Sequence, residues 1–435
     1  MAQAVAAMML RPALGLALAA LVGLAGASRS VAAPRPSTTL IRGAWVFDGE
    51  RMLGGPRDVL IRGDRIVRVS ARIGGSADSV VAGAGLTLMP GLTDLHVHTS
   101  SAAFPSQAGF VAAYDAYAQR GITAVNEFSV PPDRIAAVRG FRGPAPRVRL
   151  AARIGVPGGH GSETEWQEAL TATVASPAEA SAAMRDVVAR RPDMIKIFAD
   201  GWRYGRSADL ADMDAATMRS VVRAAHAARL PVMSHTVTLA GAWRAAGAGV
   251  DALGHGVGDA VLDAATIRLM QRKRTGYVPT LSAYEPLSTR VLTEVERDDL
   301  SPAARSIEER RVAAPIPPYE ARRWAIMVEN VRRAAAAGIP IAVGTDAGVT
   351  GVHAGWATRH ELRLLVAAGL TPAEALRAAT QNAARIMRDP RGGRVRRGAR
   401  ADLLLVAGRP DQDLDALYAV RGVWVGGRQL VAGAR

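Results

Sequence analysis

The segment 193-DMIKIFAD-200 places a lysine in the middle of an apolar run that is typical of a buried strand. Lysine and arginine together number 54, yet lysine stands only at Lys196 and Lys273. Lys273 lies in QRKRTG among other cations, as expected of a solvated surface position. Lys196 is different, because burying an ammonium is costly unless a special partner stabilises it. We therefore expect Lys196 to have a specific chemical function.

Short apolar runs like this one alternate with helical stretches rich in alanine and arginine through the middle of the chain. Such alternation predicts βα units around a parallel sheet, and eight units over about 250–300 residues match a (β/α)8 barrel. Helices are expected between most strands, for example at 177–192, 214–230 and 263–274, and the insertion 282–327 is expected to form a helical flap. The eight expected strands are 92–98, 123–128, 147–155, 194–199, 231–235, 251–256, 276–281 and 341–348.

The two ends of the chain show alternating apolar and polar residues, which indicates strands with one exposed face. A Gly63-Asp64 turn divides the stretch 58–70, and a Gly426-Gly427 turn divides the stretch 420–432. We expect both ends to build one small β domain, since chain termini often lie close together. The expected boundaries are 1–33 for a signal peptide and disordered lead-in, 34–90 and 393–435 for the two parts of the β domain, and 91–392 for the barrel.

The N-terminal segment has the features of a secretory signal peptide: a cation at Arg11, an apolar stretch from Ala13 to about Ala27, and the small-residue pattern Ala25-Gly26-Ala27. A cut after Val31-Ala32-Ala33 is also compatible with the sequence. The apolar stretch is shorter than the roughly 20 residues that a spanning helix needs. We expect a periplasmic or secreted protein with no stable membrane insertion after cleavage; the alternative is an uncleaved anchor.

Composition excludes several kinds of site. The chain has no cysteine, so thiolate metal sites and cysteine nucleophiles are ruled out, and metal ligands must come from His, Asp, Glu or groups built from them. The formal net charge is +15, but the arginines are spread along the whole chain without interleaved aromatic residues. We expect no nucleic-acid partner; a basic nucleic-acid-binding protein is the alternative, and it would bind DNA with a steep salt dependence.

Metal-ligand residue types gather at the ends of the expected strands. In a barrel the C-terminal strand ends converge on one face, so these residues would meet around one centre. His96 and His98 are two residues apart, which places both imidazoles on the same side of one strand. Independent accidents explain such a set poorly, and we predict a metal site. Its residues are His96, His98, Lys196, His235, His255 and Asp346.

An ammonium cannot ligate a metal, because it has donors and no acceptor. Burial lowers the pKa of a lysine, so Lys196 can become a neutral, nucleophilic amine. Such an amine adds CO2 to give a carbamate, whose two oxygens can bridge two cations about 3.5–4 Å apart. Arginine cannot do so, because it does not deprotonate in proteins. This chemistry explains why a chain that otherwise uses arginine keeps a lysine at position 196.

Several motifs together resemble the amidohydrolase superfamily, in its imidazolonepropionase-like and Xaa-Pro-dipeptidase-like branch. They are LTLMPG followed by LTDLHVH, IKIF, MSH, LGHG, VGTDAG, 369-GLTPAEALRAATQNAARIM-387 and 398-GARADLLLV-406. The resemblance spans about residues 40–432. It implies a distorted (β/α)8 TIM barrel in an α/β fold, with a β-sandwich domain built from both chain ends. It also implies two divalent metals: His96, His98 and Asp346 hold one, His235 and His255 hold the other, and carboxylated Lys196 bridges them.

The resemblance implies hydrolysis of a C–N bond in an amide, a cyclic amide or a dipeptide. A metal-bridging hydroxide would attack, and Asp346 would act as general base and then general acid. We expect zinc, and a site rich in histidine and carboxylate also suits manganese, iron or cobalt. The substrate is expected to be a small molecule, and a homo-oligomer is compatible with the sequence. A Xaa-Pro or other dipeptidase is the alternative. A mononuclear deaminase is less favoured, because such enzymes usually lack a bridging lysine. A non-catalytic relative is also less favoured, because it would have lost ligands that this chain keeps.

Other candidates follow the strands. His160, in 156-VPGGHGSE-163, is expected to bind substrate or assist an oxyanion, because similar members place a GGHG histidine near the substrate. Further candidates for substrate binding are Tyr204, Arg206 and His353, with solvated loop residues as the alternative. Many relatives have an Arg-Asp pair after the second strand, and Asn126-Glu127 stands here instead, so the role of that pair is open. His226 and His360 lie in helical stretches and are expected to be structural.

Overall fold

The structure is a computed structural model that describes residues 37–204 and 207–432. Ser37–Arg435 form one compact unit. The predicted signal peptide and the 1–33 boundary lie outside the described residues. In the part of the chain that the structure describes, no helix combines the length and the apolar character needed to cross a membrane.

Seven parallel strands build most of a barrel, in the order β13-β12-β11-β10-β8-β7-β6, with β9 (Thr171–Thr173) paired to β8. They coincide with seven of the eight predicted strands, and the predicted distorted TIM-barrel fold is confirmed. Their side chains are almost all buried, because helices cover a parallel sheet on its outer face and leave it no wet side. The strands are β6 (Leu92–Val97), β7 (Ile122–Glu127), β8 (Arg147–Gly155), β10 (Met194–Phe198), β11 (Val232–His235), β12 (Ala252–Gly254) and β13 (Gly276–Val278).

The predicted eighth strand, 341–348, is not a regular strand, although it closes the barrel. Ala342 N donates to Tyr277 O on β13, and Leu95 N on β6 donates to Val343 O, both at 2.9 Å. Beyond this point the pairing is irregular, because Thr345 N donates to the Asp94 carboxylate at 3.1 Å and only at 3.4 Å to His96 O, which accepts a shorter bond of 2.8 Å from Asp346 N. Asp346 then adopts a left-handed backbone conformation, with φ of 62°. The closing segment is therefore irregular where it carries a candidate metal ligand.

Helices alternate with the strands as predicted, and three of them begin at polar caps. Ser176 caps α4, Asp214 caps α5 and Asp263 caps α7, each accepting a hydrogen bond from a backbone N–H of the first turn. The helices before the insertion are α1 (Gln107–Gln119), α2 (Ile135–Gly140), α3 (Glu165–Glu168), α4 (Pro177–Ala189), α5 (Ala215–Ala227), α6 (Leu239–Ala248) and α7 (Ala264–Lys273). Those after it are α12 (Trp356–Ala367), α13 (Pro372–Arg377) and α14 (Ala383–Ile386).

The insertion 282–327 is helical, as predicted, and is bound to the loop that follows Asp346. The buried Arg290 donates to Gly351 O at 2.8 Å and pairs with Glu285. His360 bridges two carboxylates, Glu285 at 2.9 Å and Glu296 at 2.7 Å, which is the structural role expected of it. The insertion contains α8 (Leu281–Tyr284), α9 (Glu294–Asp299), α10 (Pro302–Glu309) and the first half of α11 (Pro318–Ala336).

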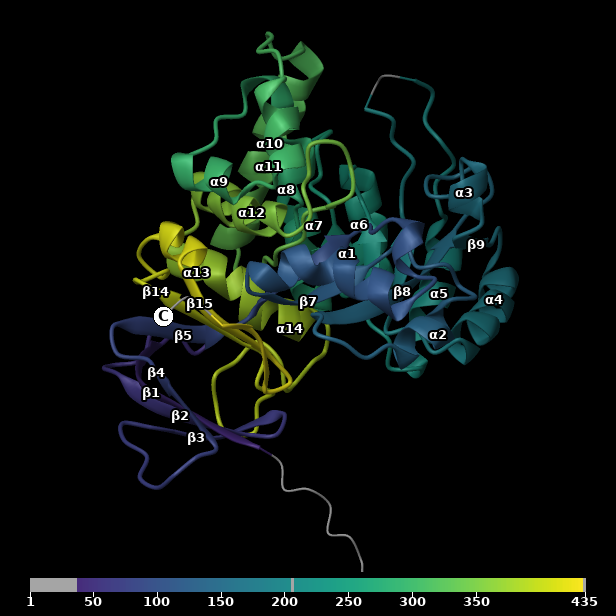
Figure 1. Cartoon of the computed structure of the whole chain (residues 1–435). Coiled ribbons are helices and arrows are strands. Elements are labelled where there is room, and N and C mark those ends of the chain that lie inside the picture. Colours follow the sequence, from purple (N-terminus) through teal and green to yellow (C-terminus); the bar gives the residue numbers. More distant parts are fainter. Residues whose placement is uncertain (1–36, 205–206, 433–435) are drawn as a thin grey trace, which may run out of the picture. The chain divides into compact units, whose positions relative to one another are not determined.

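Strands from both chain ends form one further sheet, in the order β16-β15-β14-β5-β1-β2-β3, with β4 paired to β1. Figure 1 shows these purple and yellow segments side by side, with β14 antiparallel to β5. The sheet folds back on itself, since Ile66 N donates to Ala399 O at 2.9 Å, and it encloses a core of its own that includes Trp424. The strands are β1 (Thr38–Val46), β2 (Arg57–Arg62), β3 (Arg65–Ser70), β4 (Ser79–Ala82), β5 (Leu86–Pro90), β14 (Leu403–Ala407), β15 (Val420–Val425) and β16 (Arg428–Ala432).

The two predicted hairpin turns of this sheet contact each other, which gives a test of how the chain ends are joined. Gly427 has φ of 75°, and a Cβ added there would lie 1.8 Å from Gly63 O. Gly427→Ala is expected to cost about 1 kcal/mol for the left-handed conformation and a further 1–3 kcal/mol, roughly, for the clash. Gly426→Ala is the matched control: φ is 55° and nothing lies within 4 Å, so only the first cost applies. Denaturant unfolding measures both; equal losses would contradict this contact.

Candidate active site

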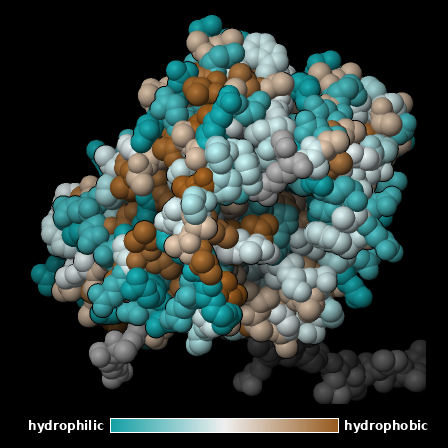
Figure 2. Space-filling view, turned by 90° about the horizontal axis from the view of Figure 1, so that it is seen from above, coloured by the Kyte–Doolittle hydropathy of each residue, from teal (hydrophilic) through white to brown (hydrophobic). Residues whose placement is uncertain are grey.

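A cavity of about 410 Å³ lies where the barrel strands end. Figure 2 shows the molecule from above, with a hollow near the middle of this face. Every predicted metal ligand lines the cavity, together with the predicted substrate residues His160 and Tyr204. The other lining residues are Phe128, Ser129, Arg153, Gly161, Trp166, Gln167, Phe198, Tyr284, Gly348 and Val349.

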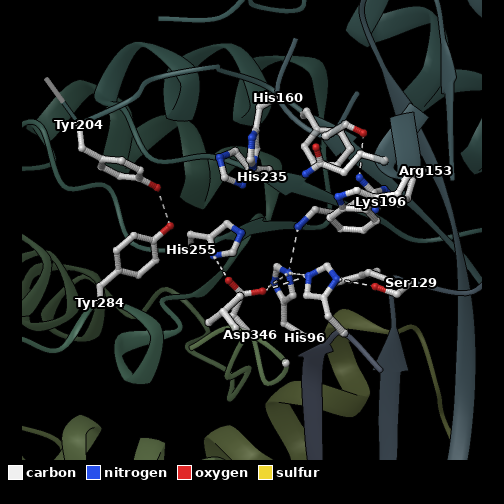
Figure 3. Close-up of a pocket in the computed structure, with 18 residues that line it drawn as sticks. His96, Ser129, Arg153, His160, Lys196, Tyr204, His235, His255, Tyr284 and Asp346 are labelled. Carbon is white, nitrogen blue, oxygen red and sulfur yellow. Dashed lines mark hydrogen bonds and ion pairs between the residues drawn. The ribbon is translucent and has the colours of Figure 1, made fainter. Parts of the chain in front are cut away.

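His96 extends from β6 toward Asp346 (Figure 3), and His98 follows directly after the strand. His98 Nε2 lies 3.0 Å from Asp346 Oδ1, and His96 Nε2 lies 3.3 Å from the same oxygen. The two Nε2 atoms are 3.2 Å apart. The two-residue spacing on one strand thus places both rings on one side, as the sequence predicted.

Lys196 reaches the same point from β10. Its Nζ lies 3.3 Å from His96 Nε2 and 4.7 Å from the centre of the Phe128 ring. Burial lowers the pKa of Lys196 to about 7; the charge of Asp346 opposes this shift, and the charge of Arg153 adds to it. Burial thus favours the neutral amine, which is the form that reacts with CO2.

His235 and His255 complete the group from the ends of β11 and β12. Their ring centres are 4.6 Å apart, and His255 Nδ1 lies 4.0 Å from Asp346 Oδ2. Burial lowers the pKa of His255 to about 3 and lowers the pKa values of His96 and His235 well below the usual range. Burial also raises the pKa of Asp346, but the nearby histidines outweigh it and hold that pKa below its usual range. The site therefore combines neutral imidazoles with a carboxylate.

This donor set fits a divalent cation. Ligand atoms of His96, His255 and Asp346 all lie within 4.8 Å of one another, and His98, Lys196 and His235 line the same cavity. The buried Nδ1 atom of His96 has no hydrogen-bond partner among the described residues. Neutral imidazole nitrogens and carboxylate oxygens are ligands of zinc, and zinc accepts mixtures of the two. The residues brought together here are thus those that a metal centre requires.

The hydrogen bonds of Glu127 show what the Asn126-Glu127 pair does in this structure. Its buried carboxylate accepts from Ser129 N at 2.6 Å, from Thr99 N at 3.1 Å and from the Tyr114 hydroxyl at 2.8 Å. It therefore fixes the chain just after His98 and also fixes Ser129. The side chain of Asn126 contacts Met387 and lies away from the cavity.

Ser129, which the sequence did not single out, orients a candidate ligand. Its Oγ shares a hydrogen bond of 2.9 Å with Nδ1 of His98, so Nε2 of His98 faces Asp346. Ser129→Ala is expected to weaken zinc binding about 10–100-fold, as the loss of such orienting partners typically does. Competition with a chromogenic chelator measures the affinity. Ser129→Thr keeps the hydroxyl and should retain most of it; unchanged affinity in the alanine variant would contradict the orienting role.

Asp94 and Thr345 hold the irregular closing segment. The Asp94 carboxylate accepts from Thr345 Oγ1 at 2.8 Å and from His96 N at 3.1 Å, while Thr358 donates to it from α12 at 2.9 Å. Burial raises the pKa of Asp94 to about 6, although these hydrogen bonds oppose the shift. Asp94 thus ties the strand that carries His96 to the segment that carries Asp346.

His160 lies where the sequence predicted, and a carboxylate fixes it. Its ring centre is 4.2 Å from that of His235, and its Nδ1 shares a 2.8 Å hydrogen bond with Glu163. Burial raises the pKa of Glu163, but the hydrogen bond and charge of His160 outweigh it and lower that pKa to about 2. Glu163 therefore stays ionised and holds one nitrogen of His160.

The remaining predicted substrate residues have different positions. The Tyr204 hydroxyl shares a 2.8 Å hydrogen bond with the hydroxyl of Tyr284, a cavity residue of the insertion that the sequence analysis missed. Arg206 lies outside the described residues. His353 does not line the cavity, and its Nε2 lies 3.1 Å from Glu308 Oε1 on α10, so it joins the last loop to the insertion.

Comparison with known proteins gives a family and a fold. The profile of the Amidohydrolase family matches residues 87–430. A curated dihydroorotase of Streptomyces coelicolor is 45% identical over 62 residues, which span 14% of this chain and only 13% of that protein. A solved Xaa-Pro dipeptidase with bound methionine is 26% identical, with a TM-score of 0.72, and the match covers 90% of this chain and 99% of that one. The ochratoxinase of A. niger, 23% identical with a TM-score of 0.73 over 92% of this chain and 96% of its own, shares the fold.

Proposed function

Since the chain belongs to the amidohydrolase family, as its motifs predicted, we propose that it is a metal-dependent hydrolase of the C–N bond in dipeptides or N-acyl amino acids. The observation that carries the proposal is the meeting of the six candidate ligands, four histidines, one aspartate and a buried lysine, in one cavity. The similarity to a Xaa-Pro dipeptidase with bound methionine supports a substrate that releases an amino acid. Cyclic amides are the second candidate class, and the short matches to dihydroorotases favour them.

We propose that His96, His98 and Asp346 hold one divalent cation, that His235 and His255 hold another, and that a carbamate on Lys196 bridges them. Two such cations, when bound, supply a nucleophile at neutral pH and polarise the scissile carbonyl. Zinc is our first choice, and manganese, iron and cobalt suit the same ligands. A deaminase with a single metal is less well supported, because it has no use for a buried lysine beside His96.

Side chains of the protein then have separate roles in the reaction. Asp346 takes a proton from the attacking water and delivers it to the leaving amine. The hydroxyls of Tyr204 and Tyr284 each have one proton, and their shared hydrogen bond uses only one of the two. The other proton can form a hydrogen bond to the substrate. His160, held by Glu163, faces the same cavity and is proposed to bind the substrate near its scissile bond.

Metal analysis combined with a substrate screen tests the function. Purified protein is expected to contain about two zinc ions per chain and to hydrolyse members of a panel of dipeptides and N-acyl amino acids. A parallel panel of cyclic amides distinguishes the second candidate class. One metal per chain together with ammonia release from an amino-substituted ring would instead favour the deaminase. A protein that binds no metal after reconstitution and hydrolyses no compound of either panel would refute the proposal.

We also propose that the chain is exported, because its N-terminal residues have the pattern of a signal peptide. The intact mass of the protein recovered from the periplasm or the medium shows after which residue the chain is cleaved. A mass matching cleavage after Ala27 or Ala33 would support export, and a full-length mass in the cytoplasm would refute it.

A further inference from the structure

The wall of the cavity contains a second buried cation, Arg153, to which the proposed reaction gives no role. Arg153 is only 5% exposed and lies on β8, in register with Lys196 on the neighbouring strand β10. In-register residues of neighbouring parallel strands present their side chains on the same face of the sheet. The two long cationic side chains therefore extend next to each other, and both line the cavity (Figure 3).

The surroundings of Arg153 compensate its charge only in part, because the charge of Glu163 favours it but Glu163 forms no ion pair with it. Its Nη2 donates to Gly161 O at 2.8 Å, while its buried Nε has no hydrogen-bond partner among the described residues. Nor does any carboxylate in the described part of the chain form an ion pair with it. Glu163 pairs with His160 and Arg203, and Asp346 pairs with the histidines. A buried guanidinium in such a position is costly unless an anion joins it.

The side chain best placed to become that anion is Lys196. The centre of the Phe198 ring lies 5.2 Å from the guanidinium carbon of Arg153 and 5.8 Å from Nζ of Lys196, so both head groups border the same ring. When the amine of Lys196 adds CO2, an N–C bond forms, one carbon–oxygen π bond opens to a carboxylate, and the displaced amine proton goes to solvent. The neighbour of Arg153 thereby changes from a neutral amine to an anion that attracts the guanidinium.

We propose that Arg153 is a positioning residue for the carbamate of Lys196, and that its guanidinium is the counter-charge that stabilises this anion. The inference rests on the proposed function, because the carbamate is part of it. It explains why a cation occupies the buried position next to the lysine, whereas the residues in register on β11, β12 and β13 are the uncharged Met233, Ala252 and Gly276. The role of Arg153 differs from that of the metal ligands, because a guanidinium has only hydrogen-bond donors and cannot bind a metal cation.

The test uses the full chain after chelator treatment in CO2-depleted buffer, to which zinc and increasing 13C-bicarbonate are added. Two signals are recorded: the bicarbonate concentration at half-maximal zinc uptake, and the carbamate carbon resonance of the zinc-loaded protein. Arg153→Gln keeps a hydrogen-bond donor but removes the charge, and it should need roughly ten-fold more bicarbonate. Arg153→Lys keeps the charge and should recover most of the difference. If the glutamine variant does not fold, Arg153→Met takes its place as the variant that removes the charge.

A matched control separates the charge from the loop that Arg153 holds. Thr171 Oγ1 donates to the same Gly161 carbonyl at 2.6 Å, so Thr171→Val disturbs that carbonyl without changing a charge. It should need the same bicarbonate concentration as the wild type. If Arg153→Gln also behaves as wild type, or if Thr171→Val shifts as far as Arg153→Gln, the counter-charge is refuted while the proposed function stands. If the wild type shows no carbamate resonance, both the carbamate and the role of Arg153 are refuted.

Discussion

Lys196→Arg is expected to lower kcat/KM by at least about three orders of magnitude. Arginine does not deprotonate, so it can form no carbamate, and the link between the two proposed cations is lost. Polarisation of the substrate by a metal ion is worth several kcal/mol, and each 1.36 kcal/mol corresponds to a factor of ten in rate. Steady-state kinetics measure the loss, and metal analysis should show fewer zinc ions per chain than in the wild type.

The other lysine of the chain provides the matched control. Lys273→Arg makes the same replacement in the exposed last turn of α7 and should leave kinetics and metal content unchanged. Lys196→Ala opens space beside His96, so a short carboxylic acid added to the buffer can take the place of the carbamate and should restore part of the activity. A Lys196→Arg protein that keeps both metals and full activity would exclude the bridging role.

The barrel could be predicted because its strands are buried on both faces and therefore appear in the sequence as short apolar runs. The eighth segment has the same composition, which is why a regular strand was predicted for 341–348. Its pairing with β6 is irregular because the N–H of Thr345 is shared between His96 O and the side chain of Asp94, about 250 positions earlier in the chain. A side chain that shares a backbone hydrogen bond in this way leaves no trace in local periodicity. The domain boundaries proposed from the sequence remain predictions.

The clustering of the candidate metal ligands could be predicted because barrel geometry brings strand ends together, and histidine is rare in this chain, with eight in total. Residues that orient these ligands gave a weaker signal. Ser129 and Tyr284 are ordinary residue types whose role depends on a partner elsewhere in the sequence, His98 or Tyr204. Arg153 was missed for another reason: arginine is so abundant here that one buried arginine does not stand out. His353 was placed at the substrate because it follows Asp346, but its side chain pairs with the insertion instead.

Asp346→Asn is expected to lower kcat by about 10²–10⁴-fold, which is the usual contribution of a general acid and base. Asparagine has nearly the same shape, and the backbone of this segment is held from outside by Asp94 through Thr345, so the loop should keep its place. The amide, however, cannot take a proton from water or pass one to the leaving amine. Kinetics at saturating zinc, where His96 and His98 still bind metal, isolate this loss from weaker metal affinity.

The split between kcat and KM decides whether Asp346 moves protons or only binds metal. If it moves protons, kcat falls at saturating zinc while KM changes little, because the cavity walls that hold the substrate are intact. If it only binds metal, added zinc restores kcat toward the wild-type value, which would exclude Asp346 as the acid and base. Asp263→Asn is the matched control, since it changes an exposed helix cap to another good capping residue and should leave both constants unchanged.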